Sequence, residues 1–162
     1  MAFYPKRAAL RLVNSSGITT MGPLRLWLPE SSTYGLIAHP PRVEYVPELL
    51  GPYTNTAYQE RWTLLGYRLS VEIDFRAIVA DGASGFANLL TYYHAGLASE
   101  TYAALQFNAY YDTSPTWRGV YPTSQWAPEP LLGKDRTGYQ YKLVLRGRDL
   151  VTNPGDWSTG AW

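Results

Sequence analysis

The sequence predicts a mainly β protein: an antiparallel β-sandwich or barrel with one flanking α-helix and a long extended arm. Residues 67–76 alternate apolar and polar without a break, and residues 139–146 repeat the pattern with one exception at Val144. Successive side chains of a strand point to opposite faces, so each segment is expected to bury one face. Only one helical pattern is present. The 162 residues suit a single domain, 1–162, with its own core.

The N-terminal part predicts two short strands, residues 8–13 and 24–28. Leu10 and Leu12 lie on one face of the first strand, and the turn-forming residues 14–17 follow it. An irregular arm is then expected over about 29–61. Pro40, Pro41, Pro47 and Pro52 lie in this arm and cannot donate to a central β-ladder, so only residues 42–46 look strand-like.

The alternating segment predicts a long strand over about 62–79, followed by a turn at 81–83 and a helix capped by Ser84. The apolar positions of this helix fall on one face and end near Gly96. They are Phe86, Leu89, Leu90, Tyr93 and Leu97. A strand is expected at 103–111, then a loop rich in Pro and Trp at 112–133, and then the closing strand from 139 to about 151.

Composition limits the function classes. The net charge of +1 gives no bulk attraction to nucleic acid or acidic lipid, so we expect no specific nucleic-acid partner. The chain has no cysteine, which excludes a thiolate nucleophile and a cysteine-ligated metal. No segment reaches the roughly 18 apolar residues of a membrane helix, so no membrane insertion is expected.

The sequence offers little catalytic chemistry. His39 and His94 have no second histidine at ligand spacing, and we expect no metal and no cofactor. Glu72 and Asp74 share a strand face about 7 Å apart, a spacing that paired glycosidase carboxylates also use. Arginines flank this pair on the same face and favour the ionised forms. A charged sheet face or a subunit contact is the preferred interpretation, and we expect no enzymatic activity.

Aromatic residues point instead to binding. One group, Tyr110, Tyr111, Trp117, Tyr121 and Trp126, is suited to stacking on sugars or single-stranded bases, to loop packing or to a protein contact. Base stacking would need a basic groove beside the rings, and only Arg118 is close to them in the sequence. The arm is too rich in Pro to build a central sheet and too apolar to stay solvated, so we expect it to contact a neighbouring subunit. The predicted interface residues are Tyr34, Val43, Tyr45, Val46, Leu49, Leu50, Tyr53, Tyr58, Trp62, Trp117 and Trp126.

The order of elements resembles the small tail proteins of long-tailed bacteriophages that share the tail-tube and distal-tail fold. The residues that carry this resemblance are 66–78, the helix 86–97 and 139–151, less than half of the chain. The resemblance implies a virion structural protein that forms a ring, a hexamer or a trimer, contacts other tail proteins and is assembled in the host cytoplasm. It also implies that an early hairpin or loop reaches the next subunit. A carbohydrate-binding β-sandwich, or another capsid or decoration protein, is the alternative.

Overall fold

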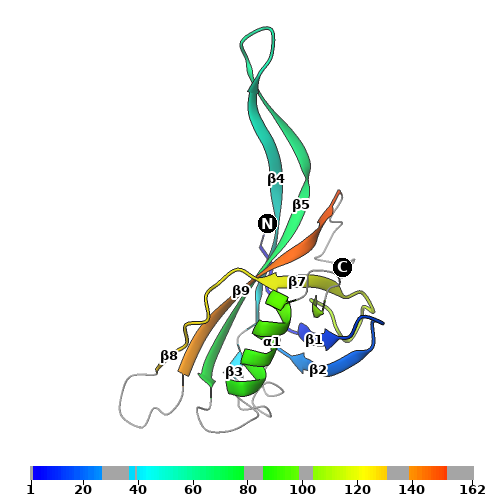
Figure 1. The fold of residues 1–162 in the computed structure, drawn as a ribbon, viewed down its shortest axis with the longest axis vertical. Coiled ribbons are helices and arrows are strands. Elements are labelled where there is room, and N and C mark those ends of the chain that lie inside the picture. The colour runs from blue at the N-terminus through cyan, green and yellow to red at the C-terminus, as the bar shows by residue number, and fades with distance from the viewer. Residues whose placement is uncertain are drawn as a thin grey trace.

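The computed structural model describes residues 2–26, 37–38, 40–78, 86–98, 104–130 and 139–152, and all structural statements refer to these. The predicted fold class is confirmed, because strands dominate and one helix flanks them (Figure 1). The elements are β1 (Ala9–Val13), β2 (Thr19–Arg25), β3 (Ile37–Ala38), β4 (Arg42–Thr54), β5 (Glu60–Ile78), α1 (Phe86–Ala98), β6 (Leu105–Asn108), β7 (Arg118–Pro122), β8 (Glu129–Pro130) and β9 (Tyr139–Val151).

The strands form one continuous sheet in which all the strand pairs are antiparallel. The order is β2-β1-β6-β7-β9-β5, and β8 pairs with β9. β3 and β4 follow one another along the far edge of β5, β3 beside residues 75–76 and β4 beside residues 60–72. The path does not close into a barrel. The N-terminal segment covers part of the outer edge, since the amides and carbonyls of Phe3 and Val43 exchange two hydrogen bonds of 2.8 Å.

The core lies on the face that the alternation predicts. Leu69, Val71, Ile73 and Phe75 of β5 are buried, and the polar residues between them are half-buried on the other face. Leu143 lies opposite Ile73 on β9 and is equally inaccessible. Residues of β1, β2 and β6 join the same apolar cluster, so the two ends of the sheet enclose one core as the layers of a sandwich do.

The helix forms where the apolar periodicity predicts it and packs mainly on β7. Its buried face differs in part from the prediction, because Leu97 is half exposed and Tyr92 is buried. Gly96 explains the difference. A Cβ at this position would lie 2.6 Å from Pro122 Cδ, so the helix backbone meets β7 here and Leu97 turns outward. Ser84 and the turn at 81–83 lie outside the described residues.

Several strand limits differ from the sequence expectation. β2 begins at Thr19, well before residue 24, and residues 27–28 lie outside the described part. β6 ends at Asn108 because a turn follows, in which the Tyr110 carbonyl accepts bonds from the Thr113 and Ser114 amides. The loop expected at 112–133 contains two strands, β7 and β8. Both are short and pair with β9, so no alternation long enough to reveal them is present in the sequence.

The largest correction concerns the arm, which was expected to be irregular outside 42–46. Instead β4 runs through residue 54 and pairs with β5 as a long hairpin. Pro47 fits because β4 is an edge strand. The N–H of Val43 points away from β5, because it donates to the Phe3 carbonyl. Pro47 is four residues further along the same regularly paired strand, so its backbone nitrogen also faces away from β5 and its missing N–H costs no bond to that strand. Pro52 sits in an interruption of the ladder between Leu50 and Tyr53.

Truncation of buried side chains should test which face of the sheet stabilises the domain. Ile73→Ala and Leu143→Ala remove methyl groups from fully buried positions, and each should lower the free energy of unfolding by about 2–5 kcal/mol. Chemical denaturation followed by circular dichroism measures the change. The exposed Lys142→Ala, on the same strand, is the control and should change it by less than about 0.5 kcal/mol. Equal effects at positions 142 and 143 would contradict the burial pattern.

Candidate assembly surface

The distal part of the β4–β5 hairpin projects away from the body of the domain (Figure 1). Directly opposed residues of an antiparallel pair share a face. Leu49 therefore lies beside Leu64 on one face, with Trp62 two residues along the same strand. Leu50 lies opposite Thr63 on the other face. Both faces of the hairpin are therefore partly apolar.

The apolar side chains of this region are exposed to solvent. Tyr58 in the turn is 91% accessible, Leu50 58% and Trp62 54%. The exposed set consists of Val46, Leu49, Leu50, Tyr53, Tyr58, Trp62, Leu64 and Leu65, which we call the hairpin surface. Contiguous apolar surface of this kind marks contact sites on proteins, and an isolated two-stranded hairpin is marginally stable in water.

Charge is scarce on the same segment. Between residues 49 and 65 the sequence has only Glu60 and Arg61, adjacent at the start of β5. The cores of protein interfaces are depleted in charge and enriched in Tyr and Trp. The hairpin surface therefore has the composition of an interface core.

The structure separates the predicted interface residues into three groups. Val46, Leu49, Leu50, Tyr53, Tyr58 and Trp62 belong to the hairpin surface. Val43 and Tyr45 do not, because the part of β4 next to the body turns these side chains into the core. Trp117 and Trp126 are half-buried against the body. Tyr34 lies outside the described residues.

Sequence reasoning missed Leu64 and Leu65, which were assigned to the long strand and not to the contact surface. The adjacent apolar pair Leu64-Leu65 was the available signal, because a strand with one solvated face would alternate. An irregularity in the pairing lies at the same place. Glu48 pairs with Gly66 and Leu49 with Leu64, which leaves Leu65 as the extra residue of a β-bulge.

A cluster of charged side chains fixes the base of the hairpin, and we call it the basal clamp: Glu48, Arg68 and Arg146. Arg68 Nη2 lies 3.1 Å from Glu48 Oε2, and Arg68 Nε and Arg146 Nη2 both donate to Glu48 Oε1. Arg68 Nη1 also donates to the carbonyls of Gly147 at 3.0 Å and Arg148 at 2.7 Å, where β9 bulges away from β5. One guanidinium thus joins β4, β5 and β9.

The clamp shifts the titration of its carboxylate. The hydrogen bonds from Arg68, supported by those from Arg146, lower the pKa of Glu48 below its ordinary value, and partial burial opposes them. Hydrogen bonds to the ionised form favour ionisation. The ion pairs at the base of the hairpin are therefore intact at neutral pH.

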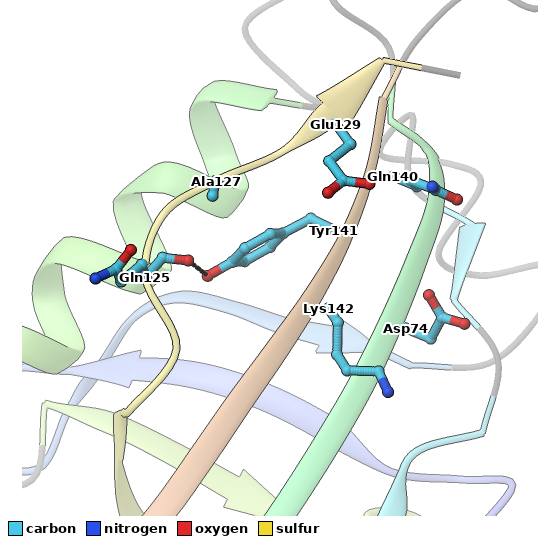
Figure 2. A pocket seen from close by; sticks show the side chains of 7 residues that line it. All are labelled: Asp74, Gln125, Ala127, Glu129, Gln140, Tyr141 and Lys142. Carbon is cyan, nitrogen blue, oxygen red and sulfur yellow. Dashed lines mark hydrogen bonds between the residues drawn. The ribbon is translucent and has the colours of Figure 1, made fainter. Parts of the chain in front are cut away.

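A polar groove lies at the opposite end of β9 and has a volume of about 510 Å³ (Figure 2). Its lining residues are Asp74, Gln125, Ala127, Glu129, Gln140, Tyr141 and Lys142. The Tyr141 hydroxyl donates to the Gln125 carbonyl at 2.6 Å, which holds the connection between β7 and β8 beside β9. Carboxylates, amides and one ammonium group line the groove, and no described side chain forms a nucleophile–base pair there.

The candidate catalytic carboxylates lie on the half-exposed face of β5. Glu72 Oε2 is 3.9 Å from Lys142 Nζ, and Asp74 lies opposite Lys142 on β9. This is an exposed charge ladder across two strands. His94 is on the exposed side of α1, and His39 lies outside the described residues.

The aromatic group is divided among separate contacts, in which Tyr110 stacks on Phe3 and Tyr121 lies under the Arg148 guanidinium. The ring of Trp126 lies 5.5 Å from that of Tyr93 and 5.0 Å from that of Tyr141, so it joins α1 to β9. The ring of Trp117 lies 5.5 Å from that of Tyr111 and 4.3 Å below the Arg11 guanidinium. The five aromatics therefore do not form one stacking platform.

Comparison with known proteins gives no assignment, since no family model and no curated protein matches the chain. No helix among the described residues is long and apolar enough to cross a bilayer.

The basal clamp predicts a specific dependence of stability on pH. Because the pKa of Glu48 is lowered in the folded state, its contribution is present above the ordinary glutamate pKa of about 4.3 and is lost as pH falls through the lowered value. Glu48→Gln should lower the melting temperature near pH 7, and the difference from the unmodified protein should disappear in strong acid, once the pH is below the lowered pKa of Glu48. Glu60→Gln at the hairpin tip is the control and should have little effect at any pH. A difference between Glu48→Gln and the unmodified protein that persists unchanged into strong acid would contradict the clamp.

Proposed function

We propose that this protein is a structural subunit of a bacteriophage tail, of the distal-tail or tail-tube kind, which acts by assembling with copies of itself into a ring. The observation that carries the proposal is the β4–β5 hairpin, an extended element with apolar side chains on both faces and little charge. The domain to which it is attached, an antiparallel sheet with one flanking helix, is the arrangement that the sequence resemblance implies.

The energetics of the hairpin support assembly. Burying the exposed half of a Leu or Trp side chain contributes about 1 kcal/mol, so a partner that covers the eight residues of the hairpin surface gains a favourable term of several kcal/mol. The basal clamp holds three strands at the junction, which limits the entropy lost when the hairpin docks.

A ring follows from the asymmetry of the contact. As the resemblance implies, the proposed contact is between the hairpin surface and a different surface of the next subunit. Head-to-tail contacts of this kind generate closed rings when the rotation between subunits closes. In the proposed virion the ring, a hexamer or trimer, stacks on neighbouring tail proteins.

The carbohydrate-binding alternative has no comparable support. A sugar platform needs several ring faces on one surface, and the predicted group does not supply this. Trp117 packs with Arg11 and Tyr111, whereas Trp126 packs with Tyr93 and Tyr141. The polar groove has amides and carboxylates of the type that sugars use, but the one aromatic ring that lines it, Tyr141, is buried.

Substitution of one face of the hairpin should test assembly. The double variant Leu49→Ser/Leu64→Ser removes an exposed apolar pair and should reduce the assembled fraction at least tenfold. Light scattering after size-exclusion chromatography gives the mass, and negative-stain imaging shows whether rings form. The control Tyr4→Ser/Ile18→Ser removes two exposed apolar side chains outside the hairpin and should assemble normally. A monomeric unmodified protein at all concentrations, or equal assembly of both variants, would contradict the proposal.

Truncation tests the hairpin as a whole. Residues 50–63 can be replaced by Asn-Gly, because Leu49 and Leu64 are paired and a two-residue turn closes such a pair. Longer deletions would remove Val43 and Tyr45 from the core. The shortened protein should keep its far-ultraviolet circular dichroism and remain monomeric. Assembly of this variant at the unmodified level would show that another surface forms the contact.

A further inference from the structure

The charge of this protein is unevenly distributed. Residues 2–26 contain four cationic side chains, Lys6, Arg7, Arg11 and Arg25, and no acidic residue. Residues 104–118 add Arg118 and a single carboxylate, Asp112. These segments together have five cations and one anion, although the net charge of the chain is only +1. Arg118 pairs with Phe107 and lies over Tyr45 on the core face, so the other four cations carry the argument. The expectation of no specific nucleic-acid partner rested on the net charge and on Arg118 as the one cation near the aromatic group in the sequence, and neither reveals this basic end.

The fold brings the basic segments together. β1 pairs with β2 on one side and with β6 on the other. Arg25 lies opposite Ala9, which is two residues from Arg11 on β1, so both arginines are on the same sheet face. The connection after β6 returns to this face, since the Tyr111 amide donates to the Arg7 carbonyl at 3.0 Å.

Cations and aromatic rings are interleaved on this face. The Arg11 guanidinium lies 4.3 Å from the centroid of Trp117, and Arg25 lies 5.5 Å from that of Tyr111. The two rings are in edge contact with centroids 5.5 Å apart. The order across the face is therefore cation, ring, ring, cation, and we call these four residues the basic face.

Arg11 is held in place by neutral groups. Its Nε donates to Gln106 Oε1 at 2.8 Å, and its Nη1 lies 3.3 Å from Thr19 Oγ1. These contacts orient the guanidinium without cancelling its charge. Asp112 is engaged by Arg7, with Nη1 and Oδ2 3.2 Å apart. Oriented cations of this kind are suited to a ligand with several anionic oxygens.

We propose that the basic face binds single-stranded nucleic acid without sequence preference. The arginines would contact phosphate oxygens, and Trp117 and Tyr111 would offer ring surface to unstacked bases. An acidic protein would be attracted by the cations alone, whereas nucleic acid would also use the aromatic rings, so the interleaved rings favour nucleic acid. The face belongs to the body of the domain and not to the hairpin, so the proposal is independent of ring assembly.

Fluorescence anisotropy with a labelled oligo-dT of about 20 nucleotides tests the proposal on the full chain. Arg11→Gln/Arg25→Gln should weaken binding at least tenfold at low salt. It should also reduce the slope of log K against log salt by about 1.4, since each contact to a single strand contributes about 0.7. Arg61→Gln/Lys142→Gln makes the same change in net charge elsewhere and should weaken binding less than threefold. Circular dichroism checks that the variants are folded.

If Arg11→Gln/Arg25→Gln does not fold, a single variant at a neighbouring exposed lysine still tests the proposal. Lys6 is exposed and directly precedes Arg7, whose carbonyl accepts from the Tyr111 amide, and Lys6→Gln should weaken binding two- to threefold. The proposal is overturned by any of three results: no saturable binding of the oligonucleotide, equal weakening in the control variant, or unchanged affinity in Lys6→Gln. Poly-glutamate that competes as strongly as oligo-dT would also overturn it, in favour of an acidic protein partner.

Discussion

The architecture depends on one strand having two roles. β5 spans 19 residues, and its C-terminal part supplies the buried row Leu69, Val71, Ile73 and Phe75, while its N-terminal part forms half of the projecting hairpin. The transition between the roles lies at Arg68, whose side chain binds Glu48 on β4 and two carbonyls of β9. The direction in which the hairpin leaves the core is therefore set by polar contacts at a single point. β9 continues beside β5 as far as Tyr67 and Gly66, and the rest of the hairpin projects away from the body (Figure 1).

This arrangement explains why the exposed apolar residues are concentrated in one place. Near the body, Val43 and Tyr45 of β4 complete the core. From Leu49 outward apolar side chains lie on both faces of the hairpin, and no second layer of the described residues covers them. The edge strand there also contains Pro47 and Pro52, which interrupt the row of N–H groups and discourage open-ended strand pairing between copies. Contact between the hairpin and another copy through side chains is therefore favoured over backbone pairing of edge strands, which would extend the sheet without limit.

Much of the body could be predicted from sequence, because long alternation in β5 and β9 and one helical period are strong local signals. The arm was harder. Its prolines argued against a strand, and only the pairing with β5 shows that Pro47 faces the free edge, where no bond is lost. β7 and β8 are too short to show a period. The interface residues could be selected by composition, but composition cannot tell which end of β4 is covered. Val43 was therefore selected together with Leu49. The basic face depends on non-local pairing and was hidden by the near-zero net charge.

The central claim is that the hairpin surface docks on another copy of the chain, and hydrogen–deuterium exchange measured over a range of protein concentrations tests it most directly. The account predicts that the amides of residues 49–65 become at least tenfold more protected as complexes form, while those of the β1–β2 turn at 14–18 remain unchanged. Exchange in 49–65 that stays fast while complexes form, with protection appearing elsewhere, would contradict it.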